Sequence, residues 1–122
     1  MVTLKFKNDL IFYRFNRVNL HIKLANMLLW TQKTFGEVVI TSAYRMDDPG
    51  VHGQNPLRGL DIRSYIYDDP TRVARLINEA WIYDLDRVTK ACALFHNSGK
   101  GDHIHLQVCD KTFNTNGRKD HV

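Results

Sequence analysis

Two stretches of this chain gather side chains that bind metal ions and transfer protons. The first runs from Ser42 through Arg45 and His52 to Asp61, and the second comprises residues 101–105, with the sequence GDHIH. A His-x-His pair alone is weak support for a site, because six histidines in 122 residues give about 0.3 such pairs by chance. The two stretches together indicate a metal site more specifically.

Three of these residues form a ligand set that is typical of catalytic zinc. His52, Asp61 and His105 offer two imidazoles and one carboxylate, which leaves the fourth tetrahedral position open for water. A structural zinc site is expected to have four protein ligands, usually including cysteines, and the spacing of Cys92 and Cys109 does not complete one. We expect these two cysteines to be buried reduced thiols rather than a disulfide.

Strand periodicity places the second stretch at the same site. On a strand, His103 and His105 project from one face, because side chains alternate with a period of two. Asp102 has the opposite parity, but it follows Gly101 at the mouth of a predicted turn, where the backbone can rotate its carboxylate toward the same cleft. Both histidines and this aspartate are therefore candidates for one site.

The pattern resembles a known family of peptidases. Its parts are a Ser42-x-x-Arg45 motif, a glycine-rich loop that contains His52 and ends in Gly59-x-Asp61, and a late Asp-x-x-His at residues 102–105. Together they resemble the zinc D-alanyl-D-alanine carboxypeptidase and L-alanyl-D-glutamate endopeptidase family. That family includes phage endolysins and shares its fold with the Hedgehog signalling domain. The match covers residues 41–61 and 102–105, and the helix-then-strand order of residues 19–45 agrees with it.

The resemblance implies a role for each residue of these motifs. It implies that His52, Asp61 and His105 are zinc (Zn2+) ligands, that Asp102 is the general base, and that His103 is a transition-state partner. Zinc lowers the pKa of a bound water from 15.7 to about 7 and polarises a scissile carbonyl, after which the base passes the proton to the leaving amine. The implied reaction is hydrolysis of an amide bond in a peptidoglycan stem peptide.

Two further residues and one departure complete the comparison with the family. The resemblance implies that Arg45 is a substrate-orienting cation, since its planar fork suits a carboxylate or carbonyl, and that Ser42 supports it. The loop between His52 and Asp61 holds eight residues, two more than is usual in the family. A loop insertion of this size still lets the ligands meet in space, but it changes the contacts that the loop offers to substrate.

Other interpretations of these residues stay open. His52 could be a surface histidine, His103 and His105 an exposed cross-strand pair, and Asp102 an Asx-turn residue. The remaining alternatives are ion pairs, between Asp61 and Arg58 or Arg63 and between Arg45 and Asp47 or Asp48. We expect no metal role for His21, His96 or His121.

Whole-chain alternatives also stay open. The main one is a catalytically silent, zinc-bound binding domain of the same fold. A non-haem iron oxygenase shares the two-histidine, one-carboxylate ligand set but generally needs an eight-stranded barrel, whereas this chain has about five recognisable strands. Nucleic-acid binding would rest only on a mildly basic balance of 17 Lys and Arg against 13 Asp and Glu, with no recognised motif.

The elements that must position the site follow an α+β order. We expect a small antiparallel sheet with two main helices, as in the Hedgehog/DD-peptidase fold. Helical spacing and a stop at Gly36 predict a helix from Asn19, and the Asp69-Pro70 pair predicts the start of a second. The remaining expectations are a weak strand or arm at 1–16, strands at 38–41, 60–66, 88–95 and 103–108, a long loop at 46–59, and a turn at 97–102.

Length and composition set the context. The 122 residues, 43% of them apolar and with a net charge of +4, predict one domain over residues 1–122, with a frayed tail at about 111–122. No stretch is long and apolar enough for a membrane helix, and no secretory signal is recognisable. We expect a monomer made in the cytoplasm whose partner is a peptidoglycan stem peptide. A phage-encoded member would reach the wall during lysis or in a virion.

Overall fold

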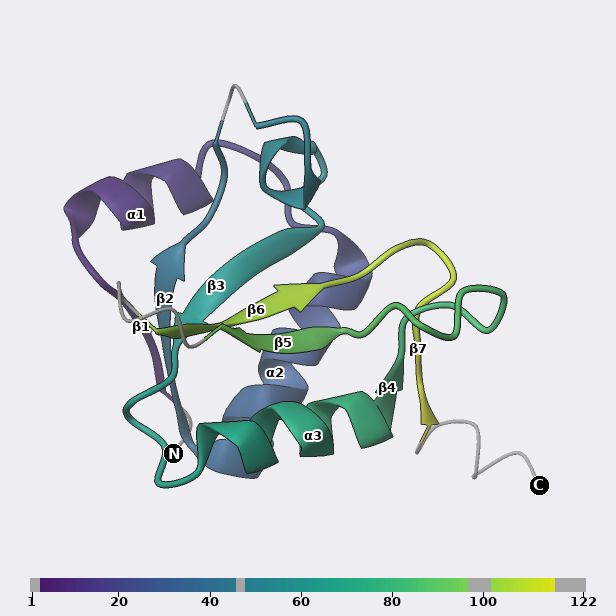
Figure 1. The fold of residues 1–122 in the computed structure, drawn as a ribbon. Coiled ribbons are helices and arrows are strands. Elements are labelled where there is room, and N and C mark those ends of the chain that lie inside the picture. Colours follow the sequence, from purple (N-terminus) through teal and green to yellow (C-terminus); the bar gives the residue numbers. More distant parts are fainter. Residues whose placement is uncertain (1–2, 46–47, 97–101, 116–122) are drawn as a thin grey trace.

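A five-stranded sheet forms the centre of the molecule. The computed structural model describes residues 3–45, 48–96 and 102–115. The strands lie in the order β1 (Thr3–Phe6), β2 (Glu37–Ser42), β3 (Gly59–Arg63), β6 (His103–Gln107) and β5 (Ala93–His96). The α+β class is confirmed, but the sheet is mixed, because β1 and β2 are parallel and only the other pairs are antiparallel (Figure 1). Two helices connect β1 to β2, which gives the chain the length that a parallel crossover needs.

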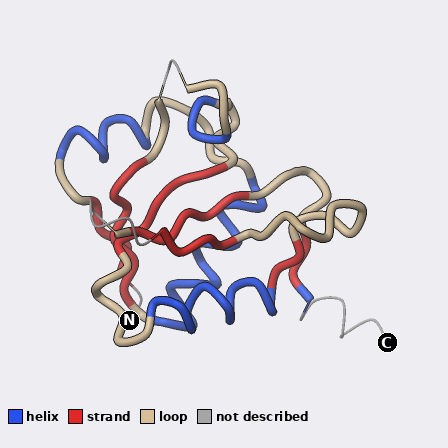
Figure 2. Tube along the Cα trace, in the orientation of Figure 1, coloured by secondary structure: helices blue, strands red, loops and turns tan. Residues whose placement is uncertain are grey.

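Three α-helices surround the sheet, as Figure 2 shows. They are α1 (Asp9–Phe15), α2 (Ile22–Phe35) and α3 (Pro70–Ala80), and two short strands, β4 (Trp81–Ile82) and β7 (Phe113–Asn114), form a separate antiparallel pair. The buried sides of α2 and α3 join the core of the sheet. The two main helices are therefore present, and α1 is an addition that the sequence did not predict. No helix of the described residues is long and apolar enough to cross a membrane.

Capping residues account for where the helices begin and end. The helix α3 begins as predicted, since the Asp69 carboxylate accepts a hydrogen bond from the Arg72 N–H at 3.1 Å. The helix α2 ends as predicted before Gly36, whose φ of +93° favours glycine. Its N-cap is His21 rather than Asn19, because the His21 Nδ1 accepts from the Lys23 N–H at 3.1 Å. In α1, the Asn8 side chain serves as the N-cap.

The central strands divide their side chains between two faces. One face carries fully buried apolar residues that pack in the same core as α2 and α3, namely Leu60 and Ile62 of β3 and Ile104 and Leu106 of β6. The residues between them on these strands point the other way. That opposite face carries Asp61, His103, His105 and Gln107, as the period of two predicts. The site is built on this second face.

Several predicted boundaries are wrong near the C-terminal half. The strand predicted at 88–95 begins only at Ala93, because the preceding segment forms turns in which Val88 is 83% exposed. The strand predicted at 60–66 spans Gly59–Arg63, and the last predicted strand ends at Gln107. The tail predicted from 111 is ordered as far as 115, because Thr112 is buried and its hydroxyl donates to the Tyr83 carbonyl at 2.8 Å. Residues 97–101 of the predicted turn and 116–122 of the tail lie outside the described residues.

Both cysteines are buried free thiols, as predicted. Burial raises the pKa of the Cys92 thiol to about 12, with a smaller contribution from nearby Cys109. The Cys109 Sγ lies 3.2 Å from the Tyr83 carbonyl, to which it donates. These contacts place the two sulfur atoms in the structural core and away from the ligand set described below.

Candidate metal centre

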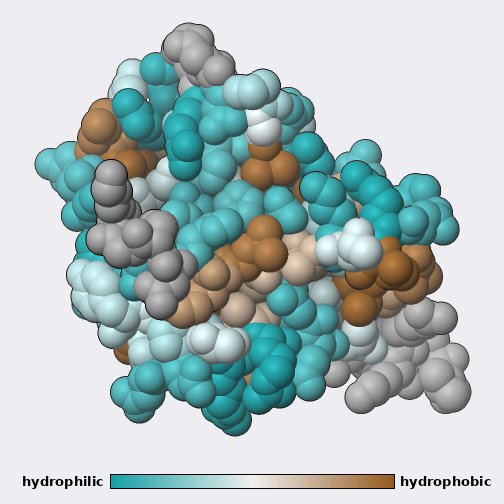
Figure 3. Space-filling model, viewed as in Figure 1, coloured by the Kyte–Doolittle hydropathy of each residue, from teal (hydrophilic) through white to brown (hydrophobic). Residues whose placement is uncertain are grey.

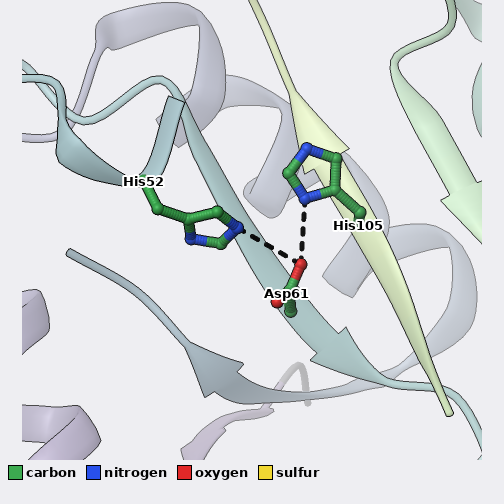
Figure 4. A group of neighbouring side chains, drawn as sticks. All are labelled: His52, Asp61 and His105. Carbon is green, nitrogen blue, oxygen red and sulfur yellow. Dashed lines mark hydrogen bonds and ion pairs between the residues drawn. The ribbon is translucent and has the colours of Figure 1, made fainter. Parts of the chain in front are cut away.

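The three predicted metal ligands meet on the open face of the sheet. Asp61 lies in the middle of β3 and His105 in the middle of β6, and the two residues are direct partners in the antiparallel register. His52 comes from a short 3-10 helix, η1 (Val51–Gly53), in the segment between β2 and β3. Figure 4 shows both imidazole rings directed at the Asp61 carboxylate. Side chains that are far apart in the sequence thus share one point.

The distances between these side chains suit a single small cation. Asp61 Oδ1 lies 2.9 Å from His105 Nδ1 and 3.5 Å from His52 Nε2, and one ligand atom from each residue falls within 4.8 Å of the others. Tetrahedral zinc with bonds of about 2.0–2.1 Å separates its ligand atoms by about 3.3 Å. The donor set and its spacing are therefore compatible with a divalent ion.

A hydrogen bond from the backbone fixes the His52 ring. His52 Nδ1 lies 3.0 Å from the Ala43 carbonyl oxygen, which can only accept, so this nitrogen carries a proton. In the neutral ring, Nε2 then presents its lone pair to Asp61. Outer-shell partners of this kind orient metal-ligating histidines in many proteins. His52 is only 7% exposed, so little else competes for its orientation.

A longer chain of hydrogen bonds fixes His105 in the same way. The Gln107 amide nitrogen donates to the Ala91 carbonyl at 2.8 Å, which turns the Gln107 Oε1 toward His105 Nε2, 3.1 Å away. This oxygen accepts a proton from Nε2, so the Nδ1 of a neutral ring faces Asp61 with its lone pair. Two lone pairs and one carboxylate then repel one another unless a cation lies among them or an imidazole takes up a proton.

The Asp61 carboxylate is held in its ionised form. It is 5% exposed, and burial raises its pKa, but the hydrogen bonds from His105 and His52 and the charges of His52 and His103 outweigh this. The net result is a pKa well below the usual range of an aspartate. An anionic oxygen at the centre of the histidines is what a hard or borderline cation requires.

Arg45 and Ser42 lie beside the ligand set. Arg45 donates to the Ser42 hydroxyl from Nε at 3.1 Å and from Nη2 at 2.9 Å, and its Nη2 lies 3.5 Å from Asp61 Oδ2. Its Nη1 lies 3.4 Å from Asp48 Oδ2. The pair with Asp48 that the sequence allowed is present, while Asp47 lies outside the described residues. Arg45 therefore touches the carboxylate of a candidate ligand while its side chain stays half exposed.

Two adjoining pockets open over the site and share Asp61 and His103. One, of about 530 Å³, is lined by His52 and His105 together with Arg45, and the other, of about 370 Å³, is lined by Asp102 and Ser42. His103 Nε2 lies 3.7 Å from Asp61 Oδ1. His103 is thus brought to the ligand set, whereas Asp102 lies on the wall of the neighbouring pocket.

Close packing of the preceding loop holds His52 in position. A side chain at Gly53 would place its Cβ 1.7 Å from the Asp48 carbonyl oxygen, and one at Gly59 would lie 2.2 Å from a Val51 methyl carbon. The Arg45 N–H also donates to the His52 carbonyl at 2.7 Å. The two extra loop residues that distinguish this chain from the family pattern therefore belong to a tightly packed segment.

Two residues at the site were not predicted. His96 was expected to have no metal role, yet it is the register partner of His103, its ring centroid lies 5.1 Å from that of His103, and it lines the larger pocket. Gln107 was not singled out at all. Its position two residues after His105 on the same strand face was the available signal, and the hairpin register was the signal for His96.

Other calls of neighbouring residues resolve simply. Arg58 reaches the Val108 carbonyl at 3.3 Å and Arg63 lies over the Tyr65 ring, so neither is the partner recorded for Asp61. His21 pairs with Asp110 at 2.8 Å, remote from the ligand set, and His121 lies outside the described residues. No protein-family model, curated protein or solved structure matches this chain significantly.

Proposed function

We propose that this protein is a zinc-dependent peptidase that hydrolyses an amide bond in peptidoglycan stem peptides, of the D-Ala-D-Ala or L-Ala-D-Glu type, on a Hedgehog/DD-peptidase-like fold. One observation carries the proposal: His52, Asp61 and His105 converge beside a pocket of about 530 Å³. The Ser-x-x-Arg and Asp-x-x-His motifs, which resemble those of the wall peptidases, support it. A phage-lysis setting belongs to the same proposal.

The ligand count supports catalysis over a purely structural metal. Two histidines and one aspartate leave one position of a tetrahedral ion for water or substrate. A bound zinc ion supplies Lewis acidity, which acidifies a water and polarises the scissile carbonyl. The larger pocket gives that open position access to a ligand, because His52, Asp61 and His105 all line it.

The chain's own residues supply the remaining functions in this proposal. Asp102 takes a proton from the attacking water and gives it to the leaving amine. His103, which lies at the boundary of both pockets, donates a hydrogen bond to the carbonyl oxygen as charge develops on it. Arg45 orients a carboxylate or carbonyl of the peptide, and Ser42 holds the guanidinium through its two hydrogen bonds.

A catalytically silent, metal-bound binding domain is the second candidate. The position of Asp102 favours it, because this residue lines the smaller pocket rather than the pocket that contains His52 and His105. In this case the chain would bind metal and retain wall peptides without cleaving them. The two candidates share the metal centre and differ only in whether Asp102 reaches the reacting atoms.

Digestion of purified peptidoglycan, followed by mass spectrometry of the released fragments, tests the proposal. We expect cleavage by the zinc-loaded protein, loss of cleavage on chelation, and recovery on addition of zinc. Asp102→Asn should abolish cleavage while the metal content, measured by elemental analysis, stays at that of the native protein. Full zinc loading without cleavage would support the silent domain, and iron in place of zinc would contradict the zinc assignment.

A further inference from the structure

A pocket with an excess of arginine lies next to the candidate metal centre. Its volume is about 610 Å³, and α1 and the segment after β2 contribute its walls, including Tyr13, Arg14, Arg17, Tyr44, Arg45 and Asp48. In Figure 1 this is the region between α1 and the chain that leaves β2. Figure 3 shows a hydrophobic cluster around α1 bordered by hydrophilic residues. The pocket therefore combines apolar surface with charge.

The positive charge of this pocket is only partly neutralised. Its one acidic lining residue, Asp48, lies 3.4 Å from Arg45. Arg17 donates to the Tyr13 hydroxyl at 2.9 Å, and its guanidinium lies over the same ring, 5.4 Å from the centroid. Within the described part of the chain, neither Arg14 nor Arg17 forms an ion pair with a carboxylate. Two guanidinium groups thus have donors available for an anion.

Arg45 connects this pocket to the metal centre. It lines both the 610 Å³ pocket and the 530 Å³ pocket, and its Nη2 lies 3.5 Å from Asp61 Oδ2. A peptide that places its scissile amide at the ligand set and extends past Arg45 would therefore enter the pocket between Tyr13 and Tyr44. The path requires no rearrangement of the strands that carry the ligands.

We propose that this arginine pocket, lined by Arg14 and Arg17, binds a free carboxylate of the substrate peptide and so selects peptides that carry one. The proposal rests on the proposed peptidase function and adds a specificity site to it. A planar guanidinium donates two parallel hydrogen bonds to a carboxylate, and a second guanidinium adds charge. The rings of Tyr13 and Tyr44 cover the apolar part of the peptide beside it.

The test compares a stem peptide that has free carboxylates with the same peptide in amidated form. For the zinc-loaded native protein, we expect kcat/KM to be about 10- to 100-fold higher for the free form, in line with charged hydrogen bonds. The double variant Arg14→Gln/Arg17→Gln should lose this preference and act on the amidated peptide at the native rate. Circular dichroism and thermal unfolding check that the variant is folded.

A matched control separates a local site from net charge. Arg72 and Arg75 on α3 have the same spacing as Arg14 and Arg17, and Arg72→Gln/Arg75→Gln removes the same charge away from α1. The control variant should keep the native preference. An unchanged preference in the α1 variant, or an equal loss in both variants, would overturn the arginine pocket.

A direct binding measurement separates failure of this inference from failure of the proposed function. If the zinc-loaded protein hydrolyses neither peptide, the peptidase proposal fails, and isothermal titration calorimetry with the same peptides then decides the pocket alone. Tighter binding of the free form that Arg14→Gln/Arg17→Gln abolishes would uphold a carboxylate site. Equal affinity for both forms would overturn it.

Discussion

The two faces of β3 and β6 have opposite character although the same ten residues build both. One face consists of fully buried leucine and isoleucine packed in the core with α2 and α3, and the other carries the candidate ligands. Leu60 and Asp61 are adjacent in the chain and belong to different faces. A shift of register by one residue would exchange the faces. The apolar face therefore holds the polar face in register, and the two faces should respond differently to substitution.

The largest effect on the polar face should come from Asp61→Asn. We expect zinc affinity to fall roughly 1,000-fold, because one of three ligands loses its charge out of a total binding free energy of ~10–16 kcal/mol. Isothermal titration calorimetry with zinc measures the change. The variant should still unfold cooperatively, since the apolar face is untouched. Native zinc affinity in Asp61→Asn would show that the ion binds elsewhere.

On the apolar face, Leu60→Ala should have the reverse effect. Leu60 is fully buried, so the truncation should lower the free energy of unfolding by about 2–5 kcal/mol, measured by urea denaturation. The folded fraction should still bind one zinc ion. A loss of zinc from Leu60→Ala that equals the loss from Asp61→Asn would contradict the separation of the two faces.

A smaller effect is expected from the outer hydrogen bond to His105. Gln107→Ala removes the acceptor 3.1 Å from His105 Nε2, and zinc affinity should fall about 10- to 100-fold. Gln107→Glu is the matched variant, because it keeps an acceptor at this position and should lie nearer the native affinity. Equal affinities in all three proteins would mean that Gln107 does not orient the ring.

The smallest effect should be the absence of a reaction at Cys92. Its pKa is raised to about 12 by burial, so at pH 8 the thiol stays protonated and inaccessible. A chromogenic disulfide reagent should leave Cys92 unmodified in the folded protein and modify both cysteines in urea. Rapid modification of Cys92 at pH 8 without denaturant would show that the core beside β5 is open.

Local patterns in the sequence predicted more of the site than of the sheet. The period of two placed His103 and His105 on one face, and the Asp69 and Gly36 signals predicted one end each of α3 and α2. Contacts between distant segments were beyond such patterns. The parallel β1–β2 pair, the Ala43 carbonyl that orients His52 and the approach of His96 to His103 all depend on how separate strands and loops pair. The helix α1 was missed because its short pattern was interpreted as an extended arm.

Anomalous diffraction at the zinc absorption edge, from crystals of the zinc-loaded protein, tests the central claim most directly. The account predicts one peak within about 2.0–2.2 Å of His52 Nε2, Asp61 Oδ1 and His105 Nδ1. These three atoms would then share one ion with an open fourth position. A peak bound by other residues, or no peak in a protein that contains zinc in solution, would contradict it.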